Sequence, residues 1–62
     1  MTRTYKIKYI DRTGATNERY LETNNNVKFM DLIRYHCATS NTGTDNILKI
    51  ELIPEEQAKK LN

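Results

Sequence analysis

The sequence has very few of the residues that hold the smallest proteins together through covalent or metal bonds. Of its 62 residues one is cysteine, one is histidine and none is tryptophan. A lone Cys37 cannot form an internal disulfide, which is typical of a reducing compartment. One histidine beside one cysteine also falls short of any structural zinc pattern. Residues 1–62 are therefore expected to form a single domain with one small core, near the lower size limit for independent folding.

Long apolar runs, glycine-rich loops and a strong charge bias are missing as well. No run approaches the roughly 18 apolar residues of a membrane-spanning helix, and no hydrophobic signal region precedes the first strand pattern. We therefore expect a cytoplasmic protein without membrane association. The net charge of +2 comes from ten basic and eight acidic residues that are interspersed along the chain. A nucleic-acid binder usually shows a basic stripe instead.

Two segments near the N-terminus predict a β-hairpin. Residues 4–10 alternate, with Tyr5, Ile7 and Tyr9 on one face and lysines on the other, as in a half-buried strand. Residues 11–17 have the composition of a turn. Residues 18–23 form the return strand, in which we place Leu21 toward the core and Tyr20 on the open face.

The C-terminal part predicts a third strand over residues 46–53. Leu48, Ile50 and Leu52 face one way, toward the core, and Pro54 ends the strand because it lacks a backbone donor. Residues 54–62 form a charged tail.

One helix is predicted over residues 26–37, with the asparagines at 24–26 as candidate N-caps. At about 100° per residue, Phe29, Met30, Ile33 and Cys37 share one arc, which we assign to the core. Leu32 and Tyr35 lie outside this arc. The helix therefore carries more apolar surface than one sheet is expected to cover.

The order strand, strand, helix, strand restricts the topology. A right-handed crossover through the helix makes the third strand parallel to the second, so the first strand can lie between them. We expect an α+β fold with a three-stranded antiparallel sheet in the order two, one, three and one helix on one face.

No residues predict catalysis. His36 and Cys37 are adjacent on the helix, so their side chains diverge by about 100° and cannot share a proton. His36 is expected at the rim of the core and Cys37 inside it. We expect a non-enzymatic protein without a metal or other cofactor.

An alternative function is nucleic-acid binding by the open sheet face. Lys6, Lys8, Lys49 and Tyr20 would share that face, as in a stacking platform with basic surroundings. Glu18, Glu22 and Glu51 lie there too and would repel phosphate. Paired surface charges explain the same pattern.

Protein binding explains more of the sequence. Leu32 and Tyr35 on the helix, with Ile47 and Ile53 on the outer sheet face, are more exposed apolar residues than a small monomer needs. They predict a contact with a second copy, with a foreign protein, or with both.

These segments together resemble the small uracil-DNA glycosylase inhibitors of Bacillus phages. The resemblance rests on Tyr5-Lys6-Ile7-Lys8, the Gly14 turn, residues 18–22, the helix 29–35 and the strand 45–52, and it covers most of residues 5–52 in element order. It implies a strand-strand-helix-strand chain that forms a homodimer in the host cytoplasm. It also implies that the dimer blocks the DNA-binding cleft of host uracil-DNA glycosylase and captures an apolar side chain in a pocket. The Asp-aromatic pair that helps to build the family's pocket corresponds to Asp31-Leu32.

The chain departs from the family pattern in two ways. Leu32 replaces an aromatic residue, and Ile33 stands where the family has an acid. The family is also acidic whereas this chain is +2, so mimicry of DNA would depend on a local acidic patch. Inhibition of another host nuclease is the related alternative. The predicted partner-binding residues are Glu18, Glu22, Asp31, Leu32, Tyr35 and His36.

Overall fold

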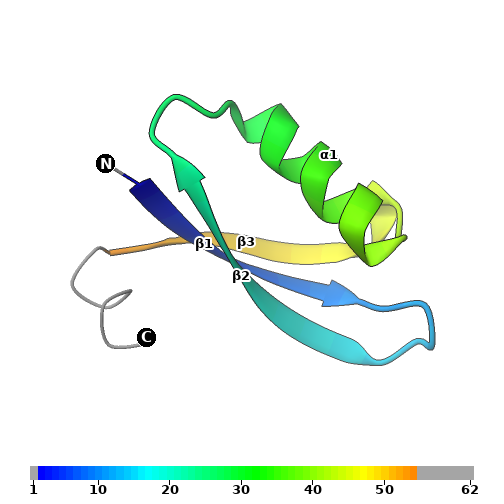
Figure 1. The fold of residues 1–62 in the computed structure, drawn as a ribbon. Helices are drawn as coiled ribbons and strands as arrows, with labels where there is room; N and C mark the ends of the chain where they lie inside the picture. The colour runs from blue at the N-terminus through cyan, green and yellow to red at the C-terminus, as the bar shows by residue number, and fades with distance from the viewer. Residues whose placement is uncertain (1, 55–62) are drawn as a thin grey trace.

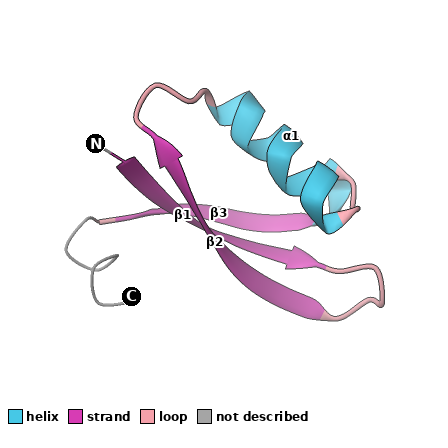
Figure 2. Ribbon diagram, viewed as in Figure 1, coloured by secondary structure: helices cyan, strands magenta, loops and turns pink. Residues whose placement is uncertain are grey.

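The computed structural model describes residues 2–54, which form three strands, one α-helix and one short 3-10 turn. The elements are β1 (Thr2–Ile10), β2 (Thr16–Asn24), α1 (Phe29–Ser40), η1 (Thr44–Asn46) and β3 (Ile47–Ile53). Both neighbours of β1 are antiparallel to it, in the order β2-β1-β3. The helix covers one face of the sheet (Figures 1 and 2). The predicted α+β fold and strand order are confirmed. Of the predicted tail 54–62, only Pro54 lies within the described residues.

The β1–β2 hairpin is closed by a tight turn that Asp11 organises. Its Oδ1 accepts hydrogen bonds from the backbone N–H groups of Thr13, at 2.9 Å, and Ala15, at 3.1 Å. Gly14 has a φ of 89°, a conformation that glycine adopts without steric cost. The hydrogen bond from Thr13 Oγ1 is the main cause that lowers the pKa of the Asp11 carboxyl. The register pairs Tyr5 with Leu21, so the prediction that Leu21 faces the core is confirmed.

Strand β3 contains a bulge that changes which of its side chains face inward. Lys8 pairs with Lys49 but Tyr9 pairs with Ile47, so Leu48 is the extra residue. A bulge of one residue reverses the alternation beyond it. Ile47 therefore packs against the core, whereas Leu48 is 52% exposed. The predicted inward position of Leu48 and outward position of Ile47 were wrong for this reason.

The helix begins and ends three residues later than predicted. Its N-cap is Lys28, which makes no side-chain capping bond, and its C-cap is Asn41 in the left-handed conformation with φ 56°. The carbonyl of Asn24 accepts a hydrogen bond from Val27 N–H, so the asparagines at 24–26 close a turn before the helix begins. They do not cap the helix directly.

The helix packs on the sheet through an arc other than the predicted one. Leu32 is 2% exposed and His36 is fully buried, and Leu32 joins Ile7 and Leu21 in the core. Phe29 and Met30, which we assigned to the core, are 53% and 59% exposed. At about 100° per residue, the buried residues Leu32 and His36 lie at one edge of the apolar arc of the helix, and Met30 lies at the opposite edge. Met30 therefore faces away from the sheet, which explains its exposure.

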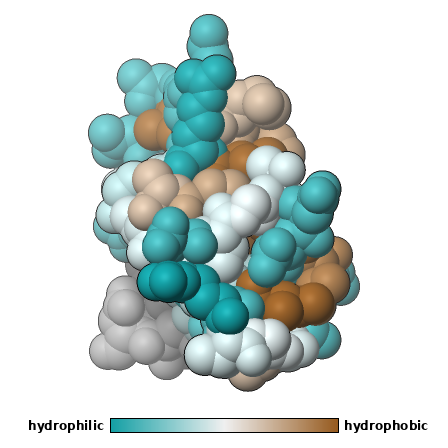
Figure 3. Space-filling view, turned by 90° about the vertical axis from the view of Figure 1, so that its right-hand side faces the viewer, coloured by the Kyte–Doolittle hydropathy of each residue, from teal (hydrophilic) through white to brown (hydrophobic). Residues whose placement is uncertain are grey.

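Within residues 2–54 no helix is both long enough and apolar enough to cross a membrane. Seen from the end of the molecule where α1 ends and the hairpin turns, apolar side chains form patches within a largely polar surface (Figure 3).

Candidate functional site

A groove lies between the helix α1 and the edge strand β2. It has a volume of about 460 Å³, in the range of small binding pockets, which is roughly 300–1,000 Å³. Its lining comes from the second half of β2, from the connection to the helix and from the first two turns of α1. The lining residues are Tyr20, Leu21, Glu22, Thr23, Asn24, Val27, Asp31, Leu32 and Tyr35.

Four of the six predicted partner-binding residues lie in this groove. Glu22, Asp31 and Tyr35 are exposed in its walls, and Leu32 lies at its buried base. The expectation that Tyr35 is exposed is confirmed, at 57%. The expectation that Leu32 is exposed was wrong, because the helix turns this side chain into the core. Leu32 can therefore shape the bottom of the groove but offers little surface to a partner.

Among the residues that the structure describes, the charged groups of the groove are all acidic. Glu22 and Asp31 line it, and no lysine or arginine of residues 2–54 does. Neither carboxylate belongs to an ion pair formed within residues 2–54. Leu21, Val27 and Leu32 supply apolar surface below them. A ligand that fits this arrangement combines an apolar group with a positive charge.

The groove also exposes backbone hydrogen-bonding groups, since β2 is an edge strand. The Asp11 N–H donates to the Ala15 carbonyl at 2.8 Å. This bond determines which residues of β2 form hydrogen bonds to β1 and which point to the free edge. Residues along an antiparallel strand bond alternately to one side and the other. Counting from Ala15, the N–H and C=O groups of Glu18, Tyr20 and Glu22 point away from β1 toward the free edge. Two of these three residues line the groove.

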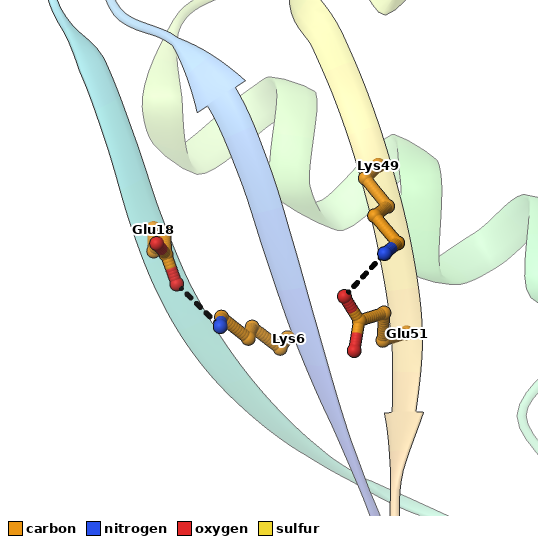
Figure 4. A network of polar contacts seen from close by, with 4 residues as sticks. All are labelled: Lys6, Glu18, Lys49 and Glu51. Atoms are coloured by element: carbon orange, nitrogen blue, oxygen red, sulfur yellow. Dashed lines mark ion pairs between the residues drawn. The ribbon is translucent and has the colours of Figure 1, made fainter.

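Glu18 lies elsewhere and is already engaged. On the sheet face turned away from the helix, its carboxylate is 2.7 Å from Lys6 Nζ, and Lys49 Nζ is 2.9 Å from Glu51 (Figure 4). Hydrogen bonding to Glu18 raises the pKa of Lys6, and hydrogen bonding to Lys49 lowers the pKa of Glu51. Two of the three lysines expected to attract phosphate are thus paired with carboxylates. This pairing matches the interpretation of paired surface charges and gives no specific support to nucleic-acid binding.

His36, the sixth predicted residue, is buried beneath the helix and does not lie at the rim as expected. Its ring packs edge-on against Tyr9, with centroids 4.6 Å apart. Arg19 Nη1 lies 3.4 Å from His36 Nδ1 and donates at 2.7 Å to Thr39 Oγ1. Because a guanidinium only donates, this contact favours the neutral tautomer in which Nδ1 is the acceptor. Burial first, and the charge of Arg19 second, lower the pKa of His36.

Apolar side chains outside the groove are exposed on α1 and on β3, and we call them the second apolar surface. Phe29 and Met30 of α1 are more than half exposed, and so are Leu48 and Leu52 of β3. The helix begins at the end of the sheet where β3 ends (Figure 1). Leu52 pairs with Tyr5 and so points to the helix-covered face, yet it is 57% exposed because it lies on the edge strand. Ile53, expected on the surface, is only 9% exposed.

Five described lining residues were not among the predicted partner-binding residues, namely Tyr20, Leu21, Thr23, Asn24 and Val27. The predicted strand order already placed β2 at an edge, so its outward-pointing Tyr20 could have been included. Val27 was not expected there, because the prediction placed it inside the helix whereas it lies in the connection between β2 and α1. Within the described part of the chain, no three His, Cys, Asp or Glu side chains are placed to hold a metal ion.

Comparison with known proteins adds no relative to this description. No protein-family model, no curated protein and no solved structure matches the chain.

Proposed function

We propose that this protein is a non-enzymatic inhibitor that binds a partner protein in the groove between α1 and β2. The observation that carries the proposal is the gathering of Glu22, Asp31 and Tyr35 around one apolar groove. Glu22 comes from β2 whereas Asp31 and Tyr35 come from α1, and all three were selected from the sequence for partner binding. A protein surface that combines an apolar floor, an aromatic wall and unpaired carboxylates suits a partner with an apolar side chain beside basic residues.

The partner that we propose is host uracil-DNA glycosylase in the host cytoplasm. A DNA-binding cleft must be positively charged to hold phosphates, so local acids compete for it whatever the net charge of the inhibitor. Glu22 and Asp31 supply this local charge on a chain whose net charge is +2. The resemblance to the phage inhibitors leads to the same target.

The test is uracil excision from a DNA oligonucleotide, measured with enzyme and protein at equal micromolar concentrations. We expect excision to stop with the unmodified protein. Tyr35→Ala should weaken inhibition about tenfold or more, since truncated interface aromatics are often the costliest changes. Arg34→Ala is the matched control, because Arg34 is an exposed helix neighbour outside the groove lining. Undiminished excision with the unmodified protein would exclude this target.

We further propose that the protein is a homodimer joined through the second apolar surface. This surface consists of four side chains that are each more than half exposed, Phe29, Met30, Leu48 and Leu52. A contact that covers them removes apolar area from water. Such a contact would leave the groove open, because none of these four residues lines it.

A further inference from the structure

We infer that the groove binds an extended, basic segment of its partner as an additional strand on β2. This inference deepens the proposed function and rests on it, because it concerns the same groove. It commits to one occupant, a strand of another protein that alternates lysine or arginine with aliphatic residues. A second copy of this chain would be a different occupant.

The free backbone of β2 is the first observation. Glu18, Tyr20 and Glu22 direct their N–H and C=O groups to the edge that has no neighbouring strand within residues 2–54. An extended peptide satisfies such groups by pairing with them, which supplies affinity without regard to its sequence. The carbonyl of Asn24 is already bonded to Val27 N–H, so the available stretch ends there.

The two sides of this edge differ in chemistry, and they define the sequence of the added strand. On the helix side, the groove has the apolar groups of Leu21, Val27 and Leu32. On the other side, Tyr20 and Glu22 present one ring and one carboxylate, whereas the carboxylate of Glu18 is already paired with Lys6 at 2.7 Å. Since side chains of a strand alternate between faces, aliphatic residues would point to the groove and basic residues to Glu22.

Charge complementarity excludes the nearest alternatives. An acidic or uncharged strand would leave Glu22 unpaired, because the residue opposite it on β1 is Thr4. The edge strand β3 of a second copy presents both signs, in Lys49 and Glu51, and these already pair with each other at 2.9 Å. An alternating basic strand places its positive charges beside Glu22, which has no charged partner opposite it on β1.

The probe is a synthetic peptide of seven residues, capped at both ends, that alternates lysine with valine and isoleucine. Binding to the isotope-labelled, unmodified protein is followed by titration and by amide hydrogen exchange in NMR spectra. We expect slower exchange at the amides of Tyr20 and Glu22, which face the free edge. The amides of Leu21 and Thr23 already bond to β1 and should change little.

Matched variants and peptides give the second readout. Glu22→Gln should raise the Kd for the lysine peptide by about two- to fivefold, as for a single exposed ion pair. Glu51→Gln, at the opposite edge of the sheet, should leave the Kd unchanged. A peptide with N-methyl groups on every second amide, which cannot pair along one edge, should bind about tenfold more weakly or worse.

Each outcome decides between the alternatives. Alternating protection together with loss of affinity on N-methylation supports strand addition. Equal affinity of the N-methylated peptide overturns it and leaves capture of side chains alone. No binding by the lysine peptide, with glycosylase inhibition intact, overturns strand addition but not the proposed function. Binding of the peptide without any inhibition of the glycosylase supports strand addition and removes the target. The amides of Tyr20 and Glu22 could instead become protected from exchange without peptide, to an extent that rises with protein concentration. That result would assign the edge to a second copy and overturn the inference.

Discussion

His36 is the residue whose environment departs most from what its chemistry favours. It is fully buried, its Nε2 has no hydrogen-bond partner within the described chain, and its Nδ1 faces Arg19. Both the loss of water and the neighbouring positive charge disfavour the imidazolium form. The fold therefore holds this ring neutral.

A pH dependence of stability follows from the lowered pKa of His36. Above its ordinary value of 6.5, the ring is neutral in both the folded and the unfolded chain, so stability is independent of this residue. Below that value the unfolded chain takes up a proton that the folded chain does not. The free energy of unfolding should then fall by at most about 1.4 kcal/mol per pH unit until the folded pKa is reached.

Urea denaturation between pH 7.5 and 5, as an experimental range of about 2.5 units, measures this slope. His36→Phe keeps an aromatic ring against Tyr9 but cannot titrate, so the slope should vanish in this variant. An unchanged slope in the variant would show that another group causes the effect.

Leu32 provides the sharpest prediction on packing. Because Leu32 is 2% exposed in the central cluster, Leu32→Ala should lower the free energy of unfolding by about 2–5 kcal/mol. A loss of this size is a large part of the stability of a small domain. Arg34→Ala, an exposed neighbour, should change it by less than about 0.5 kcal/mol. Equal stability of the two variants, measured by circular dichroism in urea, would contradict the position of Leu32.

At the scale of elements, the helix lacks a capping side chain at its beginning. Lys28 has the extended backbone conformation of an N-cap, with φ −77° and ψ 150°, but its side chain offers no acceptor. Lys28→Ser should raise the free energy of unfolding by about 1 kcal/mol, because the serine oxygen can accept a bond from the first turn. Thermal melting of Lys28→Ser against Lys28→Ala separates this effect from the loss of charge. No difference between the two variants would show that the first turn is satisfied by water.

The helix and strands also show which structural features could be predicted from sequence patterns. The existence and type of all four main elements could be predicted, because alternation or helical periodicity is recognisable in residues 4–10, 18–23, 26–37 and 46–53. The packing side of the helix could not. Its apolar arc runs from Leu32 to Met30 and is wider than the sheet contact, so periodicity alone does not indicate which border packs. The bulge at Leu48 was also invisible, since strict alternation fits the sequence equally well.

At the scale of the whole molecule, the strand order could be predicted because crossover handedness leaves few alternatives. The groove could be predicted only in part. Its acids were predicted as the local acidic patch that mimicry of DNA requires, and Tyr35 from its position outside the presumed core. Its free backbone edge depends on the hydrogen-bonding pattern that the Asp11 turn sets.

Self-association is the prediction that belongs to this scale. Sedimentation velocity should show the 7.3 kDa chain changing to a species of twice that mass as concentration rises. Phe29→Lys places a charge on the exposed second apolar surface and should shift this change to at least about tenfold higher concentration. Arg34→Ala should leave it in place. A single monomeric species at all concentrations would exclude the dimer.

The position of β1 in the middle of the sheet has a consequence for the order of events during translation. The ribosome makes β1 before either of its neighbours, and the adjoining hairpin can close as soon as β2 has left the exit tunnel. The edge of β1 that will bond to β3 stays unpaired while α1 and η1 are synthesised. Only when residues 47–53 have emerged can this edge be closed. The sheet is thus completed only after its third strand has emerged, and a nascent chain that stalls before that point offers the open edge of β1 to chaperones and to other nascent chains.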